Sequence, residues 1–176
     1  KHGSTMGILA DNLRVDFGKM VSWKNGNVTK LTTGIGALLK AHGVTHYKGL
    51  GAFEKKEGDE FVMSVDAGRD PYDNSGNAGS KEMLKARNVI LATGSVPAQI
   101  PSFPVNGKNI IGSREALDQK TLPKSMVVIG GGVIGLEIGS FHAKLGTQVT
   151  VLEGSTQLLP GTDLDCVQVV EKLLKK

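Results

Sequence analysis

The feature that most constrains the fold is a glycine-rich stretch directly after an apolar run. Residues 126–129 are Met-Val-Val-Ile, and residues 130–135 read Gly-Gly-Gly-Val-Ile-Gly. The pattern Gly-x-Gly-x-x-Gly between a strand and a helix is typical of the phosphate-binding turn of a dinucleotide-binding βαβ unit. In such a turn Gly130 would permit the tight bend, Gly132 the close approach of a pyrophosphate, and Gly135 close packing of the helix on the sheet.

A second apolar run, residues 148–152, ends at Glu153, which lies 18 residues after Gly135. A carboxylate about 20 residues beyond the turn accepts hydrogen bonds from the ribose hydroxyls of NAD. It would repel the 2′-phosphate of NADP, and residues 154–157 offer no arginine to bind that phosphate. The sequence therefore predicts an α/β, Rossmann-like fold that binds NAD, with a glycine-rich turn of an ordinary α/β domain as the alternative. The residues expected at this nucleotide are Gly130, Gly131, Gly132, Val133, Ile134, Gly135, Leu136 and Glu153.

The composition excludes several classes of protein. Glycine makes up 24 of the 176 residues without forming a repeat, which fits the turns of an α/β fold. The net charge is only +4, and the lysines are scattered without interleaved aromatic residues, so we expect no nucleic-acid partner. No apolar run reaches the roughly 18 residues that a membrane span needs, so no membrane partner is expected either.

Candidates for catalysis or metal binding are few. Cys166 is the only cysteine, so no disulfide can form within the chain and no oxidising compartment is implied. Its place at the start of an expected helix favours a buried, unreactive thiol. His46, on an expected strand, and His142, on the helix after the glycine turn, are interpreted as structural. We assign no catalytic residue and no metal ligand.

Apolar periodicity predicts the order of the remaining elements. Phe61, Met63 and Val65 alternate on one side of an expected strand, whereas the continuous apolar run within residues 87–93 is typical of a buried strand. Ser113 and Asp163 are expected to cap the two helices that follow them. The expected helices are 28–41, 114–117, one starting near 133, and 164–175; the expected strands are 44–47, 60–67, 87–93, 126–129 and 148–152. Residues 68–81 are expected to form a mobile surface loop.

Several motifs together resemble the pyridine nucleotide-disulfide oxidoreductases. They are Leu91-Ala92-Thr93-Gly94-Ser95 followed by prolines, Ser113-x-x-Ala116-Leu117, Leu122-Pro123-Lys124-Ser125, the glycine-rich turn, and residues 148–153. The resemblance covers the chain except residues 68–81, which look like an insertion. It implies a partial two-domain flavoprotein: residues 1–96 as the C-terminal part of an FAD-binding domain, 97–124 as a proline-rich connector, and 125–176 as the first half of an NAD-binding domain.

The resemblance also implies a function and further site residues. The expected reaction passes electrons from dihydrolipoyl groups through FAD to NAD, with lipoyl carrier proteins of 2-oxo acid dehydrogenase complexes as partners. The full-length enzyme would be a homodimer, intracellular and in the mitochondrial matrix if eukaryotic. Gly51, Thr93, Gly94 and Ser95 would contact FAD, and Ile134 and Glu137 would lie near the flavin. A first-turn carboxylate such as Glu137 could equally serve only to stabilise its helix.

The family's reaction also needs a cysteine pair, a first Gly-x-Gly-x-x-Gly, and a C-terminal His–Glu pair, none of which this sequence contains. We therefore expect the chain to be an internal piece of the enzyme and inactive in isolation. Two alternatives remain open. One is another disulfide reductase of the same family, which would generally use NADPH and against which Glu153 argues. The other is a catalytically inactive nucleotide-binding module.

Overall fold

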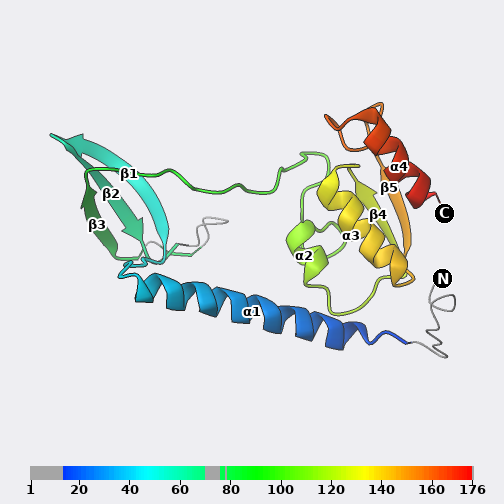
Figure 1. Cartoon of the computed structure of the whole chain (residues 1–176), viewed down its shortest axis with the longest axis horizontal. Helices are drawn as coiled ribbons and strands as arrows, with labels where there is room; N and C mark the ends of the chain where they lie inside the picture. The colour runs from blue at the N-terminus through cyan, green and yellow to red at the C-terminus, as the bar shows by residue number, and fades with distance from the viewer. Residues whose placement is uncertain (1–13, 70–75, 78, 176) are drawn as a thin grey trace. The chain divides into compact units, whose positions relative to one another are not determined.

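The computed structural model describes residues 14–69, 76–77 and 79–175. They fall into two compact units, which lie within Lys1–Val28 plus Gln99–Lys176 and within Thr29–Ala98. Helix α1 contributes residues to both units. In chain order (Figure 1) the elements are α1 (Phe17–Ala41), β1 (Leu50–Glu57), β2 (Glu60–Asp66), β3 (Lys81–Ala86), α2 (Ser113–Leu117), β4 (Ser125–Ile129), α3 (Val133–Lys144), β5 (Gln148–Leu152) and α4 (Leu164–Leu174).

Helix α1 is longer than its apolar spacing predicts, because it begins at Phe17 and not at residue 28. The side chain of Asp16 accepts a hydrogen bond from the backbone N–H of Lys19 (3.0 Å) and so caps the helix. No residue of α1 is buried. Its first turns nevertheless carry half-buried apolar residues at helical spacing, Phe17, Met20 and Val21, so the capping aspartate and this spacing together mark the true start.

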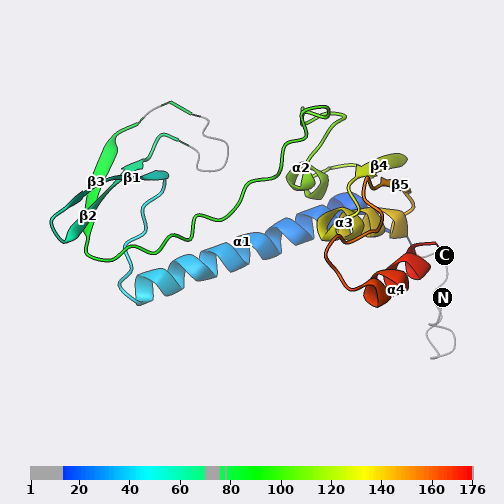
Figure 2. The same cartoon turned by 90° about the horizontal axis from the view of Figure 1, so that it is seen from above.

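The unit within Thr29–Ala98 contains an antiparallel sheet in the order β1-β2-β3 (Figures 1 and 2). The predicted strand 60–67 is confirmed as β2, but its more buried side carries Val62, Ser64 and Asp66 and not the alternating Phe61, Met63 and Val65. Strand β3 was not predicted. The expected surface loop 68–81 falls partly outside the described residues, and its last position already belongs to β3.

Two predicted strands of this unit are wrong. Residues 44–47 and 87–93 are irregular, and Ile90 and Leu91 are 91% and 79% exposed. A strand needs a neighbour to satisfy its backbone N–H and C=O groups, and no strand among the described residues pairs with either segment. The apolar run within 87–93 therefore has the composition of a buried strand but nothing beside it in the described part of the chain.

The unit that contains the glycine turn is a βαβ arrangement. Strands β4 and β5 pair in parallel, with Val127 opposite Thr150 and Ile129 opposite Leu152. Helix α3 connects them and covers one face of this two-stranded sheet, and its Gly139 lies against Val128. The predicted β4, α3 and β5 are confirmed, and with them the α/β, Rossmann-like fold class.

Helices α2 and α4 lie at their predicted positions, but the cap of α2 and the burial of Cys166 on α4 differ from the prediction. The cap of α2 is Gly112, whose N–H donates to the carboxylate of Glu115 (2.7 Å), whereas Ser113 is already helical. Asp163 caps α4 as predicted and accepts from the N–H of Asp165 (3.1 Å). Cys166 is exposed, so the expectation of a buried thiol is wrong. The adjacent Val167 is the α4 residue that is buried.

His142 is fully buried on α3, with the rings of Phe17 and Phe141 at centroid distances of 6.1 and 5.3 Å. Neither ring nitrogen has a hydrogen-bond partner among the described residues. Burial lowers the pKa of His142 below its usual 6.5, and the polar backbone of Ala116 nearby opposes this in part, without a hydrogen bond of standard geometry to the ring. The buried imidazole is therefore neutral in the folded protein, in agreement with a structural role.

The unfolding free energy of the chain is expected to fall as the pH drops below about 6.5. The unfolded state then binds a proton at His142 that the folded state resists, so acid favours unfolding. Chemical denaturation at pH 7.5 and 5.5 measures the loss. His142→Phe should flatten this dependence, and His46→Gln, at an exposed histidine, should keep it. An unchanged pH dependence in His142→Phe would contradict the assignment.

Candidate functional site

The glycine turn leaves β4 through a backbone conformation that favours glycine. Gly130 has φ of +107°, and its N–H donates to the carbonyl of Leu152 at 2.8 Å. This hydrogen bond ties the start of the turn to the end of β5. The turn therefore lies at the carboxyl ends of both parallel strands, which is where open α/β sheets bind their ligands.

Gly132 and Gly135 meet opposite surroundings. A Cβ built on Gly132 would have no atom within 4 Å, so this position is open to an approaching ligand. A Cβ on Gly135 would lie 2.5 Å from the carbonyl oxygen of Gly130 and 3.0 Å from Val128, so the helix packs on the strand without room for a side chain. These are the spatial requirements of a dinucleotide turn.

The first turn of α3 presents backbone donors to the same open space. The N–H groups of Val133, Ile134 and Gly135 have no acceptor within their own helix, because the first N–H groups of any helix lack one. They coincide with the positive end of the helix dipole. Open space at Gly132 beside unpaired N–H groups fits a pyrophosphate.

Leu136 and Glu137 occupy different positions on α3. The side chain of Leu136 is 6% exposed and its N–H donates to the carbonyl of Gly132 (3.0 Å), so both its apolar and its polar groups are already engaged. Glu137 is exposed. A ligand contact at Leu136 remains a prediction, and the structure gives this residue a packing role.

Glu153, at the end of β5, reaches back to the glycine turn. Its Oε2 accepts from the N–H of Gly131 (2.6 Å), and its Oε1 accepts from the N–H and the hydroxyl of Ser155 (both 2.7 Å). These bonds, the one from the Ser155 hydroxyl first, lower the pKa of Glu153 to about 2. The carboxylate is therefore ionised at neutral pH and stands beside the turn, as sequence spacing predicts.

The segment after Glu153 also contacts Gly131, through the backbone of Leu159. The N–H of Leu159 donates to the carbonyl of Gly131 at 2.9 Å, and Leu159 has φ of +50°, which leucine rarely adopts. A Cβ on Gly131 would overlap Leu158. The middle glycine of the turn is thus fixed by residues 153–159, a contact that spacing alone does not reveal.

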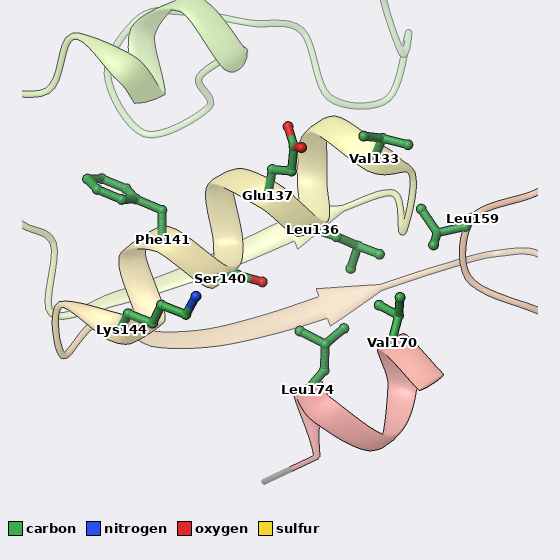
Figure 3. Close-up of a pocket in the computed structure, with 9 residues that line it drawn as sticks. All are labelled: Val133, Leu136, Glu137, Ser140, Phe141, Lys144, Leu159, Val170 and Leu174. Atoms are coloured by element: carbon green, nitrogen blue, oxygen red, sulfur yellow. The ribbon is translucent and has the colours of Figure 1, made fainter. Parts of the chain in front are cut away.

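A groove of about 500 Å³ extends from the turn between α3 and α4 (Figure 3). Leu159, Val170 and Leu174 form one side of it and face α3. Its α3 side is lined by Val133, Leu136, Glu137, Ser140, Phe141 and Lys144. Three of the residues predicted from sequence, Val133, Leu136 and Glu137, therefore line this groove.

The sequence profile described as "Pyridine nucleotide-disulphide oxidoreductase" matches residues 5–176. The chain belongs to this family. Among curated proteins, the dihydrolipoyl dehydrogenase of Geobacillus stearothermophilus is 39% identical over the whole chain and 34% of its own length. That of Trypanosoma brucei brucei is 39% identical over 92% of this chain and 31% of its own length. This member of the family thus spans about a third of the length of the curated relatives that it matches.

The fold agrees with this family. The crystal structure of LpdA from Mycobacterium tuberculosis matches with a TM-score of 0.82 at 24% identity, over 99% of this chain and 36% of that one. At this identity the match supports the fold alone. Of the four residues expected at FAD, Gly51 lies in β1, whereas Thr93, Gly94 and Ser95 lie in an exposed irregular segment. None of these four residues lines the groove between α3 and α4.

Two further observations bear on other chemistry. Among the described residues, no group of three or more His, Cys, Asp and Glu side chains is placed to hold a metal ion. No helix in the described part of this oxidoreductase family member is long and apolar enough to span a membrane.

Proposed function

We propose that this chain supplies the NAD-phosphate-binding unit of a dihydrolipoyl dehydrogenase, an FAD-dependent oxidoreductase that passes electrons from dihydrolipoyl groups to NAD. The observation that carries the proposal is the joint placement of an open Gly132, a helix N-terminus and the Glu153 carboxylate at the ends of two parallel strands. The name shared by the curated relatives supports the reaction.

The residues present fit NAD. The pyrophosphate would lie over Gly132 against the N–H groups of Val133 and Ile134, where no side chain intrudes. The ribose hydroxyls of the adenosine half would donate to the ionised carboxylate of Glu153. When bound, NAD supplies the hydride-accepting chemistry, and the residues of this chain bind and orient it.

The FAD part of the proposal rests on the family to which the chain belongs. Thr93, Gly94 and Ser95 are exposed and lie in an irregular segment. We therefore propose FAD binding on the ground of the family alone. The same holds for the lipoyl carrier proteins as partners, for the homodimer of the full-length enzyme, and for an intracellular location. For a eukaryotic protein that location would be the mitochondrial matrix, as the name of the Dictyostelium discoideum relative states for that protein.

Calorimetric titration of the purified chain with NADH and NADPH, repeated with Glu153→Gln, tests the proposal. The chain should bind NADH and bind NADPH at least about tenfold more weakly. Glu153→Gln should weaken NADH binding by about tenfold, because a charged acceptor is lost, and should improve NADPH binding, because the repulsion of its 2′-phosphate is removed. Asp165→Asn, at an exposed carboxylate of α4, is the matched charge control and should leave both affinities unchanged.

The outcomes separate the remaining candidates. Stronger binding of NADPH than of NADH would favour another disulfide reductase of the family. Binding of NADH with no change in Glu153→Gln would remove the carboxylate from the site. Binding of neither nucleotide would contradict the proposal that this unit forms an NAD site.

A further inference from the structure

We propose that Ser155 is a positioning residue, which fixes the orientation of the Glu153 carboxylate and thereby the preference for a nucleotide with free ribose hydroxyls. The identity of the nucleotide in this inference rests on the proposed function. The positioning of the carboxylate does not depend on that function, because every contact involved lies within residues 131–159.

The carboxylate of Glu153 is held at both oxygens. Ser155 supplies two donors, its N–H and its hydroxyl, and both reach Oε1 at 2.7 Å. Gly131 supplies a further donor, its N–H, which reaches Oε2 at 2.6 Å. A carboxylate with donors on opposite oxygens cannot rotate without breaking one of them, so Ser155 sets its plane relative to the glycine turn.

The remaining acceptor capacity has a definite direction. An ionised carboxylate has about four acceptor positions, two on each oxygen. Both Ser155 donors reach Oε1, so the oxygen that offers a nucleotide an acceptor position is Oε2, which faces Gly131 and the turn. A ribose hydroxyl of a nucleotide whose pyrophosphate lies over Gly132 would approach from that side, whereas Oε1 faces Ser155.

Ser155 and the neighbouring Thr156 differ in their contact with the Glu153 carboxylate. It is exposed, so its side chain contributes little packing and its hydroxyl is the part that matters here. Thr156, the next residue, also carries a hydroxyl, but among the hydrogen bonds of the described residues none joins it to the Glu153 carboxylate. The turn that the carboxylate serves is fixed independently, because Leu159 bonds to the carbonyl of Gly131. Removal of the Ser155 hydroxyl should therefore loosen the carboxylate and leave the turn in place.

The nucleotide test compares the chain with Ser155→Ala, Ser155→Thr and Thr156→Ala by calorimetric titration with NADH and with NADPH. Ser155→Ala should weaken NADH binding by about three- to tenfold and change NADPH binding by less than about twofold. Ser155→Thr keeps the hydroxyl and should restore NADH binding to within about twofold of the original. Thr156→Ala should bind as the unchanged chain does.

A second measurement reads the carboxylate without any nucleotide. The ¹³C shift of the Glu153 carboxyl, followed against pH, should show a raised pKa in Ser155→Ala and not in Ser155→Thr, and the Gly131 amide should exchange faster in Ser155→Ala. The unfolding free energy at pH 7 should fall slightly in Ser155→Ala, because a carboxyl whose folded-state pKa is less depressed stabilises the folded state less, and it should be unchanged in Ser155→Thr and Thr156→Ala. Unchanged NADH affinity in Ser155→Ala together with an unchanged carboxyl titration would overturn the proposal. If the unchanged chain binds neither nucleotide, the proposed function fails and the preference with it, while the carboxyl titration still confirms or overturns the positioning.

Discussion

Replacing Gly135 by alanine is expected to destabilise the βαβ unit by about 3 kcal/mol. The added Cβ would lie 2.5 Å from the carbonyl oxygen of Gly130 and 3.0 Å from Val128 Cγ1. The first of these atoms is backbone, so the clash can be relieved only if α3 moves away from β4. That movement would also carry the N-terminus of α3 away from the turn, and NADH binding should be lost together with stability.

Chemical denaturation measures this effect, and Gly139→Ala is its matched control. Gly139 lies one turn further along the same helix, and a Cβ there would meet Val128 and Val149 at 3.4 Å, close to ordinary van der Waals contact. Since alanine is also a better helix former than glycine, Gly139→Ala should be neutral or slightly stabilising. Equal losses in the two variants would show that Gly135 is not required for close packing.

Replacing Gly132 by alanine should have the opposite pattern, with folding retained and nucleotide binding reduced by about a hundredfold. Gly132 has φ of −76° and ψ of 176°, which any residue adopts, and its Cβ would stand in open space. Stability should therefore change by less than about 1 kcal/mol. The methyl group would, however, occupy the space in which a pyrophosphate must approach the N–H groups of α3.

Titration with NADH and a denaturation curve, made on the same sample, separate the two effects. Gly154→Ala is the control, because its Cβ would also meet open space but lies beyond the turn, next to Glu153. It should bind NADH nearly as the unchanged chain does. NADH affinity that survives in Gly132→Ala would mean that the phosphates do not lie over this glycine, and the proposed site would be wrong in its central feature.

The parts of the fold that sequence predicts well are those decided by neighbours within a few residues. Strand β4, the turn, and α3 follow one another directly, and a glycine at positive φ or a helix cap acts through local contacts. Asp163 caps α4 for the same reason. The number of residues from Gly135 to Glu153 is also predictable, because one helix and one strand lie between them and fix it.

The failed predictions are those in which the outcome depends on distant partners. Residues 87–93 have the composition of a buried strand, but Ile90 and Leu91 are exposed because no described strand pairs with them. Cys166 has an ordinary position on α4, and only the rotation of that helix decides that Val167 is buried and the cysteine is not. At the site, the hydrogen bond from the N–H of Leu159 to the carbonyl of Gly131 depends on a leucine conformation with positive φ, which no sequence pattern predicts.

The sheet of the βαβ unit has a thermodynamic consequence of its own. Helix α3 covers only one face of β4 and β5, and on the other face Val127, Ile129 and Leu152 are 60%, 44% and 54% exposed. Side chains that are already hydrated in the folded state contribute little to the heat-capacity change of unfolding, which arises from newly exposed apolar surface. The stability curve of this unit is therefore flatter than that of a fully covered sheet, with a denaturant m-value that is small for its length.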